Sequence, residues 1–297
     1  MKFKSIEAFL ITVETGSIRA AARKLDLSQP AISKTLKSLE LELGVPLFTR
    51  GTKGIDLTEF GRVFKIRAAT IWKEQTKAID EIRQLRGEME GSVSLLLSPA
   101  ASILLAPTAV RQFRRECPDV TIHMYEGLEA TALEKLRASA IEFAICPSNS
   151  SKTSKEFVTE RLVNIKMAVL GHKNHPLRAA GSLEEIRDAD WVHVGAGGKI
   201  NPLIEKFYRK FNLEPPNVAV ECDSFTGSIS MIMNSDMIGL VPESWLLDPK
   251  VRATCSIIDV KEGPLLNEIS LIQRRDIPLT PAAQKLATYF HRLGEFN

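Results

Sequence analysis

The sequence lacks the features that mark a membrane protein or an exported one. Its longest apolar runs, such as Ile103 to Ala106, are far shorter than the ~18–20 residues that a membrane-spanning helix needs. Glu7 and Glu14 interrupt the apolar stretch near the start, and no small-residue cleavage site of a secretion signal follows. We therefore expect a cytoplasmic protein that makes no contact with a membrane.

Metal-binding, redox and catalytic patterns are also scarce. His172 and His175 lie three apart without further ligands nearby, so we expect no metal site. The chain has no GxSxG, HExxH or Walker A pattern and no Cys/His nucleophile pair, which excludes the common enzyme classes and predicts no cofactor. The four cysteines are widely spaced and form no CxxC pair, and we expect them to be reduced and mostly buried: Cys117, Cys146, Cys222 and Cys255.

Positive charge is present but concentrated near the start of the chain. Residues 1–65 contain eleven Lys and Arg against seven Asp and Glu, a net charge of +4, whereas the whole chain carries +3. The remaining residues therefore sum to about −1. A small basic segment on a neutral body is typical of a module that binds nucleic acid.

Apolar residues at helical spacing predict three short helices in this basic segment. Gly16 ends the first helix, and Ser17 and Ser28 are expected to cap the second and third. The first helix has its apolar face at Ile6, Phe9, Leu10 and Val13. The third is expected to bury Ile32, Leu36, Leu39 and Leu43. Two helices joined by a short turn indicate a helix-turn-helix.

The third helix presents polar and cationic side chains away from its apolar stripe, and a strand–glycine turn–strand pattern follows at residues 47–58. Such side chains can reach base edges and phosphates, while the wing would lie on the DNA backbone. The helix taken alone is equally well explained as the solvated face of an amphipathic helix. The candidate DNA-binding residues are Ser28, Gln29, Pro30, Ser33, Lys34, Lys37, Arg50 and Lys53.

The order and spacing of these segments resemble the DNA-binding head of the LysR-type transcriptional regulators. The matching stretches are SIRAAARKL, LSQPAISKTLKSLE, LGVPLFTR and LTEFG. The resemblance implies an α+β winged helix-turn-helix at residues 1–58, a linker and dimerisation helix at 59–90, and an α/β effector-binding domain at 91–297. That domain would be two-lobed and similar to type 2 periplasmic binding proteins. The resemblance also implies double-stranded promoter DNA, a small-molecule effector and a dimeric or tetrameric assembly of the chain, with RNA polymerase as a further contact.

The linker region has a heptad pattern with one polar residue, Gln75, in its seam. Phe64, Ile71, Ala78 and Leu85 are seven apart, and Ala68, Gln75 and Ile82 interleave them. This spacing favours pairing of two such helices between subunits. The alternative is a helix that packs on its own domain. Gly87 and Gly91 are expected to form a flexible hinge after it.

Beyond the hinge, strand and helix patterns alternate, which predicts parallel sheets covered by helices. We expect one lobe at about 91–162 and 267–297, a second at about 163–266, and a ligand cleft between them. Small and polar residues in strand-to-helix loops suit an organic anion there, although such residues are also ordinary turn chemistry. The candidate ligand-binding residues are Ser98, Ala100, Ala101, Ser102, Glu126, Gly127, Leu128, Gly197, Gly198, Ile200, Phe225 and Thr226.

Two finer interpretations concern the signal that the protein senses. The stretches QLRGEMEGSV, ECDSF and IQRRDIPLTPAA resemble regulators of aminobenzoyl-glutamate and toluenesulfonate catabolism within the LysR-type family. The alternative is a redox-sensing regulator with the same head, which would need a reactive, accessible thiol close to a second one. Cys222 and Cys255 are the pair that the second interpretation would use.

Overall fold

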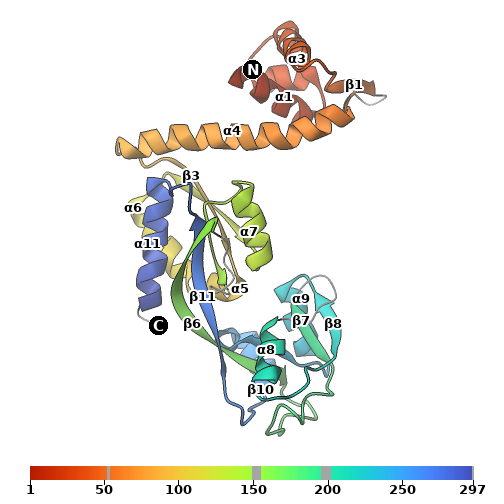
Figure 1. Cartoon of the computed structure of the whole chain (residues 1–297), viewed down its shortest axis with the longest axis vertical. Helices are drawn as coiled ribbons and strands as arrows, with labels where there is room; N and C mark the ends of the chain where they lie inside the picture. Colours follow the sequence, from red (N-terminus) through yellow and green to blue (C-terminus); the bar gives the residue numbers. More distant parts are fainter. Residues whose placement is uncertain (52–53, 149–154, 195–201, 296–297) are drawn as a thin grey trace. The chain divides into compact units, whose positions relative to one another are not determined.

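The computed structural model describes residues 1–51, 54–148, 155–194 and 202–295, and the chain divides into two compact units (Figure 1). Unit 1 comprises Met1–Gly91 with Arg137–Ala140, and unit 2 comprises Ser92–Leu136 with Ile141–Asn297. Across the described residues, no helix is both long enough and apolar enough to cross a membrane.

Unit 1 begins with three helices whose ends are set by the predicted capping residues. They are α1 (Phe3–Thr15), α2 (Ile18–Lys24) and α3 (Gln29–Leu43). Gly16 ends α1 in the left-handed region at φ 65°, where glycine has no Cβ penalty. The Ser17 hydroxyl accepts a hydrogen bond from the Ala20 N–H at 3.4 Å, and the Ser28 hydroxyl accepts one from the Ala31 N–H at 3.3 Å. The sequence pattern therefore predicts this helix-turn-helix correctly.

Phe9 lies at the centre of the core of unit 1 and is fully buried. Its ring meets Phe64 edge-on, with 4.9 Å between ring centroids, and packs at a tilt on Phe48. The other buried members of the core are Ile6, Ala8, Ala22, Ile32, Leu36, Leu39, Leu47 and Ala68. The prediction that Leu43 is buried is wrong. It is 39% exposed, because it is the last residue of α3 and Gly44 turns the chain away from the core.

The wing is a two-stranded antiparallel sheet, β1 (Phe48–Gly51) with β2 (Gly54–Leu57). Thr58 then caps the long helix α4 (Glu59–Leu85), accepting from the Gly61 N–H at 2.9 Å and donating to Pro46 O at 2.7 Å. A Cβ at position 61 would overlap the backbone carbonyl of Leu47, so only glycine fits there. The head and the helix are thus joined through close backbone packing.

The heptad seam of α4 divides into two halves in the structure. In the first half, Ala68 is fully buried in the core of unit 1, and Phe64 and Ile71 pack against that core. In the second half, Ile82 is 61% and Leu85 is 73% exposed. The expectation that one chain leaves the whole seam uncovered is therefore wrong for the first half. It holds for the last two turns.

The segment after α4 is a hydrogen-bonded turn where the glycines suggested a flexible hinge. The buried side chain of Gln84 donates to the Glu90 carbonyl at 2.9 Å, and the Glu88 N–H donates to the Arg83 carbonyl at 3.0 Å. Gly91, at φ 97°, packs so closely on the side chain of Asp80 that a Cβ there would overlap it. The chain therefore folds back on the end of α4 before the next strand begins.

Unit 2 is built on a sheet with the strand order β10-β6-β11-β5-β3-β4, and β9 also pairs with β6. The strands are β3 (Gly91–Leu97), β4 (Val120–Glu126), β5 (Phe143–Pro147), β6 (Phe157–His172), β9 (Gly239–Pro242), β10 (Cys255–Ile257) and β11 (Leu265–Arg274). A second sheet pairs β7 (Trp191–Val194) with β8 (Val218–Cys222). The expected parallel pairing is found for β3 with β5 and for β7 with β8, whereas β6 and β11 run antiparallel.

The two long strands β6 and β11 carry the chain between the lobes. They pair with each other along most of their length. In the first lobe β11 also pairs with β5, and in the second lobe β6 also pairs with β9 and β10. This arrangement corresponds to the two crossings that the sequence predicts.

Helices cover the sheets of both lobes. They are α5 (Pro99–Leu104), α6 (Ala106–Glu116), α7 (Glu129–Arg137), α8 (Pro202–Lys210), α9 (Phe225–Asn234), the 3-10 helix η2 (Glu243–Leu247), α10 (Pro249–Thr254) and α11 (Pro281–Glu295). In the first lobe, α6 and α11 lie side by side on one face of the sheet and α7 lies on the other (Figure 1). The Ser98 side chain caps α5, and Pro99 occupies its first turn, where proline is favoured.

Candidate functional site

The predicted recognition helix α3 presents its candidate residues to solvent. Gln29, Lys34 and Lys37 are exposed, as are Ser28 and Pro30, while Ser33 is half-buried. Within the described residues, neither Lys34 nor Lys37 takes part in an ion pair. These side chains contribute little to the core, which Ile32, Leu36 and Leu39 supply from the opposite side of the helix.

The wing contributes Arg50 from β1, which is paired with Ile55 on β2. The backbone of Arg50 is described but its side chain is not, and Lys53 lies outside the described residues. The position of Arg50 places a cationic residue on the strand that follows the recognition helix in the chain.

The candidate residues of the first lobe gather where β3, β4 and β5 end. The Ser98 N–H donates to the Ile145 carbonyl at 2.8 Å, and the Gly127 N–H donates to the Leu97 carbonyl at 3.1 Å. These two bonds bring the start of α5 and the segment 126–128 together at the carboxyl edge of the sheet, which is where ligands of α/β folds bind. Ser102 and Leu128 are half-buried there, and Glu126 is exposed.

Two expectations about this edge need correction. The Ala101 N–H is not free for a ligand, because the Ser98 hydroxyl accepts it at 3.3 Å. Ser98 itself is 1% exposed, and Ala100 and Ala101 are buried. The hydroxyl that the sequence suggests as an anion ligand thus caps α5 inside the protein.

Ser148 and Glu129 were missed by the sequence interpretation. The Ser148 hydroxyl donates to Glu129 Oε1 at 2.7 Å, which ties the end of β5 to the start of α7. The sequence contains a signal for it, because Ser148 lies just after the apolar run at 143–146, as Ser98 lies just after the run at 93–97. The candidate edge of the first lobe therefore includes a third strand end.

In the second lobe, the residues at the start of α9 have different roles. The Ser224 hydroxyl caps α9 by accepting from the Gly227 N–H at 3.3 Å, and Thr226 is exposed. Phe225, expected as an apolar wall for a ligand, packs edge-on against Trp245 at 5.6 Å in the core of this lobe. The other candidates of this lobe, Gly197, Gly198 and Ile200, lie outside the described residues.

His193 on β7 is a further polar residue at the carboxyl edge of the second sheet. It is 4% exposed, and neither ring nitrogen has a hydrogen-bond partner among the described residues. Burial lowers the pKa of the imidazole, while the nearby carboxylate of Glu221, paired with His193 across β7 and β8, raises it. An unpaired buried imidazole is unusual and calls for an explanation.

The four cysteines are free thiols, and three of them are buried. Burial raises the pKa of the Cys146 thiol to about 12, and it also raises the pKa of Cys117 and Cys255. A thiol with a raised pKa is a poor nucleophile at neutral pH. The described residues hold no cluster of His, Cys, Asp and Glu that is able to bind a metal ion.

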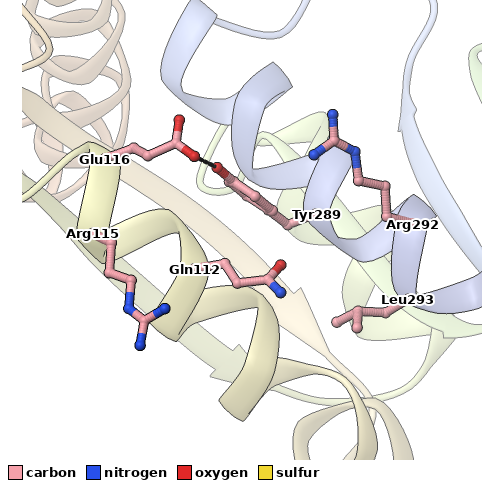
Figure 2. Close-up of a pocket in the computed structure, with 6 residues that line it drawn as sticks. All are labelled: Gln112, Arg115, Glu116, Tyr289, Arg292 and Leu293. Carbon is pink, nitrogen blue, oxygen red and sulfur yellow. Dashed lines mark hydrogen bonds between the residues drawn. The ribbon is translucent and has the colours of Figure 1, made fainter.

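A surface pocket of about 350 Å³ lies between α6 and α11, and no predicted site residue lines it (Figure 2). Its lining is Gln112, Arg115, Glu116, Tyr289, Arg292 and Leu293. Tyr289 donates its hydroxyl proton to Glu116, and Lys285 pairs with the same carboxylate at 2.7 Å. These hydrogen bonds, from Lys285 first, lower the pKa of Glu116. This network fixes the two helices to each other.

Two protein families match this chain over consecutive segments. Residues 3–62 match the family described as "Bacterial regulatory helix-turn-helix protein, lysR family", and residues 86–294 match the "LysR substrate binding domain". The first match covers the helix-turn-helix and the wing, and the second covers both lobes. The second match alone includes more than half of the chain.

Individual relatives agree with these matches. The chain is 24% identical over 287 residues to the transcriptional regulator GbpR of Azospirillum brasilense, covering 96% of this chain and 84% of that protein. It is 24% identical over 298 residues to the regulator PcaQ of Agrobacterium fabrum, covering 99% and 96%. The crystal structure of full-length CbnR with its target DNA aligns with a TM-score of 0.74 at 20% identity, over 99% of this chain and 100% of that one. At this identity the structural likeness shows the fold.

Proposed function

Because the chain belongs to the LysR family of DNA-binding transcriptional regulators, we propose that α3 reads base pairs of a partly palindromic operator. In this proposal Gln29 and Ser33 contact base edges, while Lys34 and Lys37 contact phosphates or guanine acceptors. Ser28 and Pro30 lie in the first turn of α3 and would approach the backbone, with Arg50 and Lys53 of the wing beside them. The observation that supports this most is the exposed polar face of α3 on a fully buried apolar stripe.

We further propose that the effector is a small organic anion bound between the lobes, at the two carboxyl edges described above. Backbone N–H groups at the start of helices favour anions, and Ser102, Gly127 and Thr226 lie at these edges. Aromatic carboxylates and sulfonates, such as aminobenzoyl-glutamate or toluenesulfonate, are the ligands that the sequence stretches favour. The redox alternative has no support from the buried thiols, whose pKa values are raised.

We also propose that the chain assembles as a dimer through the end of α4 and as a tetramer through the effector domains, and that RNA polymerase is contacted at the promoter. Ile82 and Leu85 are large apolar side chains that the chain itself leaves exposed on α4. In the effector domain, β4 ends the order of its sheet and exposes Met124 at 55%. Exposed strand edges of this kind are ready to pair or pack with a second copy.

The DNA-reading proposal is tested by selecting operators from a random duplex pool with full-length protein. Wild type should enrich a partly palindromic sequence, and Gln29→Ala should relax the preference at one base pair in each half. The loss should be about 1–3 kcal/mol at that base pair. The exposed residue Lys2, outside α3, supplies a control through Lys2→Ala, which should enrich the wild-type sequence. Identical selections by wild type and Gln29→Ala would contradict the assignment of Gln29.

A further inference from the structure

Two buried histidines of the second lobe differ in how their rings are satisfied. His175 is 4% exposed, its Nδ1 accepts from the Leu177 N–H at 3.0 Å, and its Nε2 lies 2.9 Å from the Asp236 carbonyl. His193 is equally buried, yet both of its ring nitrogens are without a hydrogen-bond partner in the part of the chain that the structure describes. Leaving a buried polar group without a hydrogen-bond partner destabilises the folded state. His175 therefore has a structural role, and His193 has no evident one.

His193 lies near the end of β7, at one of the two strand edges where the effector is proposed to bind. The preceding residue, Val192, packs into the core of the second lobe with Leu170 and Ile232. Because side chains alternate along a strand, His193 faces the opposite side of the sheet. It is one residue from the end of β7, and its register partner Glu221 is one residue from the end of β8. His193 therefore lies at the carboxyl edge, where Ser224 follows β8 and Thr226 lies in the first turn of α9.

Among the residues that the structure describes, few charged groups lie around this ring. Glu221 is the carboxylate that acts on the imidazole directly. On α8, which contacts β7 through the Trp191–Tyr208 ring pair, Glu205 pairs with Arg209 at 2.8 Å, and Lys206 and Lys210 are exposed. α9 has no charged residue, and Asp223 after β8 is exposed. The pKa of His193 is lowered by burial, so the ring is neutral at neutral pH.

We propose that His193 binds the anionic group of the effector through its protonated ring, so that effector binding takes up a proton from solvent. The inference rests on the proposed anion function and adds a residue and a pH dependence to it. A carboxylate or sulfonate beside the ring supplies the missing hydrogen-bond partner and raises the pKa of the imidazole. Affinity then increases as the pH falls, by at most about tenfold per pH unit for one proton.

In the ligand-free protein, folding stability should decrease as the pH falls, whereas effector affinity should increase. An unfolded chain has a histidine pKa of about 6.5. Since burial lowers the pKa of His193 in the folded state, the unfolded state binds the proton first, and stability falls as the pH decreases below about 6.5. His193→Phe removes the ionisable imidazole without breaking a hydrogen bond to a described residue. It should therefore fold and lose less stability than wild type between pH 7 and pH 5.5.

The experiment measures binding of benzoate, 4-aminobenzoate, p-toluenesulfonate and inorganic phosphate to the full-length protein at pH 8 and pH 6 by calorimetry. Wild type should bind at least one probe more tightly at pH 6, by up to about a hundredfold. His193→Gln and His193→Phe should abolish this increase. His123→Gln on β4, an exposed histidine, is the matched control and should keep it.

Each outcome has a definite meaning. A probe that binds wild type and both His193 variants with the same pH dependence overturns this inference and leaves the proposed anion function intact. If no probe binds wild type at either pH, the proposed anion function is contradicted, and the inference fails with it.

Discussion

The DNA-binding head and the effector domain place their candidate residues in opposite ways. In the head, six of the residues come from α3 and its cap, and the core beneath them is made by neighbouring elements of unit 1. In the effector domain, the candidates come from separate strand ends and helix starts between residues 98 and 226, which only the pairing of distant strands brings to the sheet edges. The polar groups of the head face solvent, whereas several in the effector domain, such as Ser98, serve to cap helices. A site formed by one helix can therefore be inferred from sequence more fully than a site formed by residues that are far apart in the sequence.

The largest loss of stability is expected for Gly61→Ala, which changes only the packing of the DNA-binding head. The new Cβ would overlap the Leu47 backbone carbonyl, which cannot move aside without shifting the wing. Overpacking of this kind costs about 1–3 kcal/mol or more, so the head should unfold at lower denaturant concentration and operator binding should be lost. Circular dichroism during urea titration, together with a DNA-binding assay, measures both.

Gly181→Ala is the control, because nothing lies within 4 Å of a Cβ at that position in the effector domain. It should leave both the urea unfolding curve and operator binding unchanged. A Gly61→Ala protein with wild-type stability would show that the contact between α4 and the wing is looser than described.

The next prediction concerns the exposed half of the α4 seam, which is proposed as the dimer interface. Ile71→Asp would be ambiguous, because Ile71 packs on the core of its own chain. Ile82→Glu places a charge in the exposed half and should weaken the dimer, with operator affinity reduced about tenfold or more. Sedimentation measures the assembly.

Thr76→Glu is the matched control, since Thr76 is exposed and lies about a third of a turn off the seam. It should sediment as wild type does. An unchanged assembly for Ile82→Glu would rule out the last turns of α4 as the dimer contact.

The smallest effect concerns the thiols. Cys146, Cys117 and Cys255 are buried and have raised pKa values, so a thiol reagent at pH 7.5 should label half-buried Cys222 first. Peroxide should change operator affinity by less than about twofold, because burial raises the pKa of the other three thiols and makes them poor nucleophiles. Mass spectrometry of the labelled protein measures the order. Rapid labelling of Cys146, or loss of operator binding on oxidation, would contradict this prediction and favour a redox-sensing regulator.

The contrast between the two regions also explains which parts of the structure the sequence predicts. Ser17 and Ser28 act as the caps expected, because capping depends on residues three positions away. The split of the α4 seam was not predictable, because heptad spacing does not reveal that the first half meets Phe9 of the same chain. The antiparallel course of β6 and β11 depends on pairing across about a hundred residues, which local patterns do not encode.

In the effector domain the same limit applies to single residues. The sequence places Ser98 and Phe225 at strand ends, but it does not show that Ser98 caps a buried helix or that Phe225 packs on Trp245. His193 was passed over because a lone histidine in an apolar strand is usually a satisfied core residue. Only the folded structure shows that its ring has no hydrogen-bond partner among the described residues.

The most direct test of the account is the ratio of affinities of full-length wild type for its selected operator and for a scrambled duplex, measured at several salt concentrations. A specific regulator should prefer the operator by at least about a thousandfold at physiological salt. Affinity for both duplexes should fall as salt rises, because Lys34, Lys37 and the wing displace counterions. Equal affinity for the two duplexes would contradict the claim that α3 reads DNA sequence.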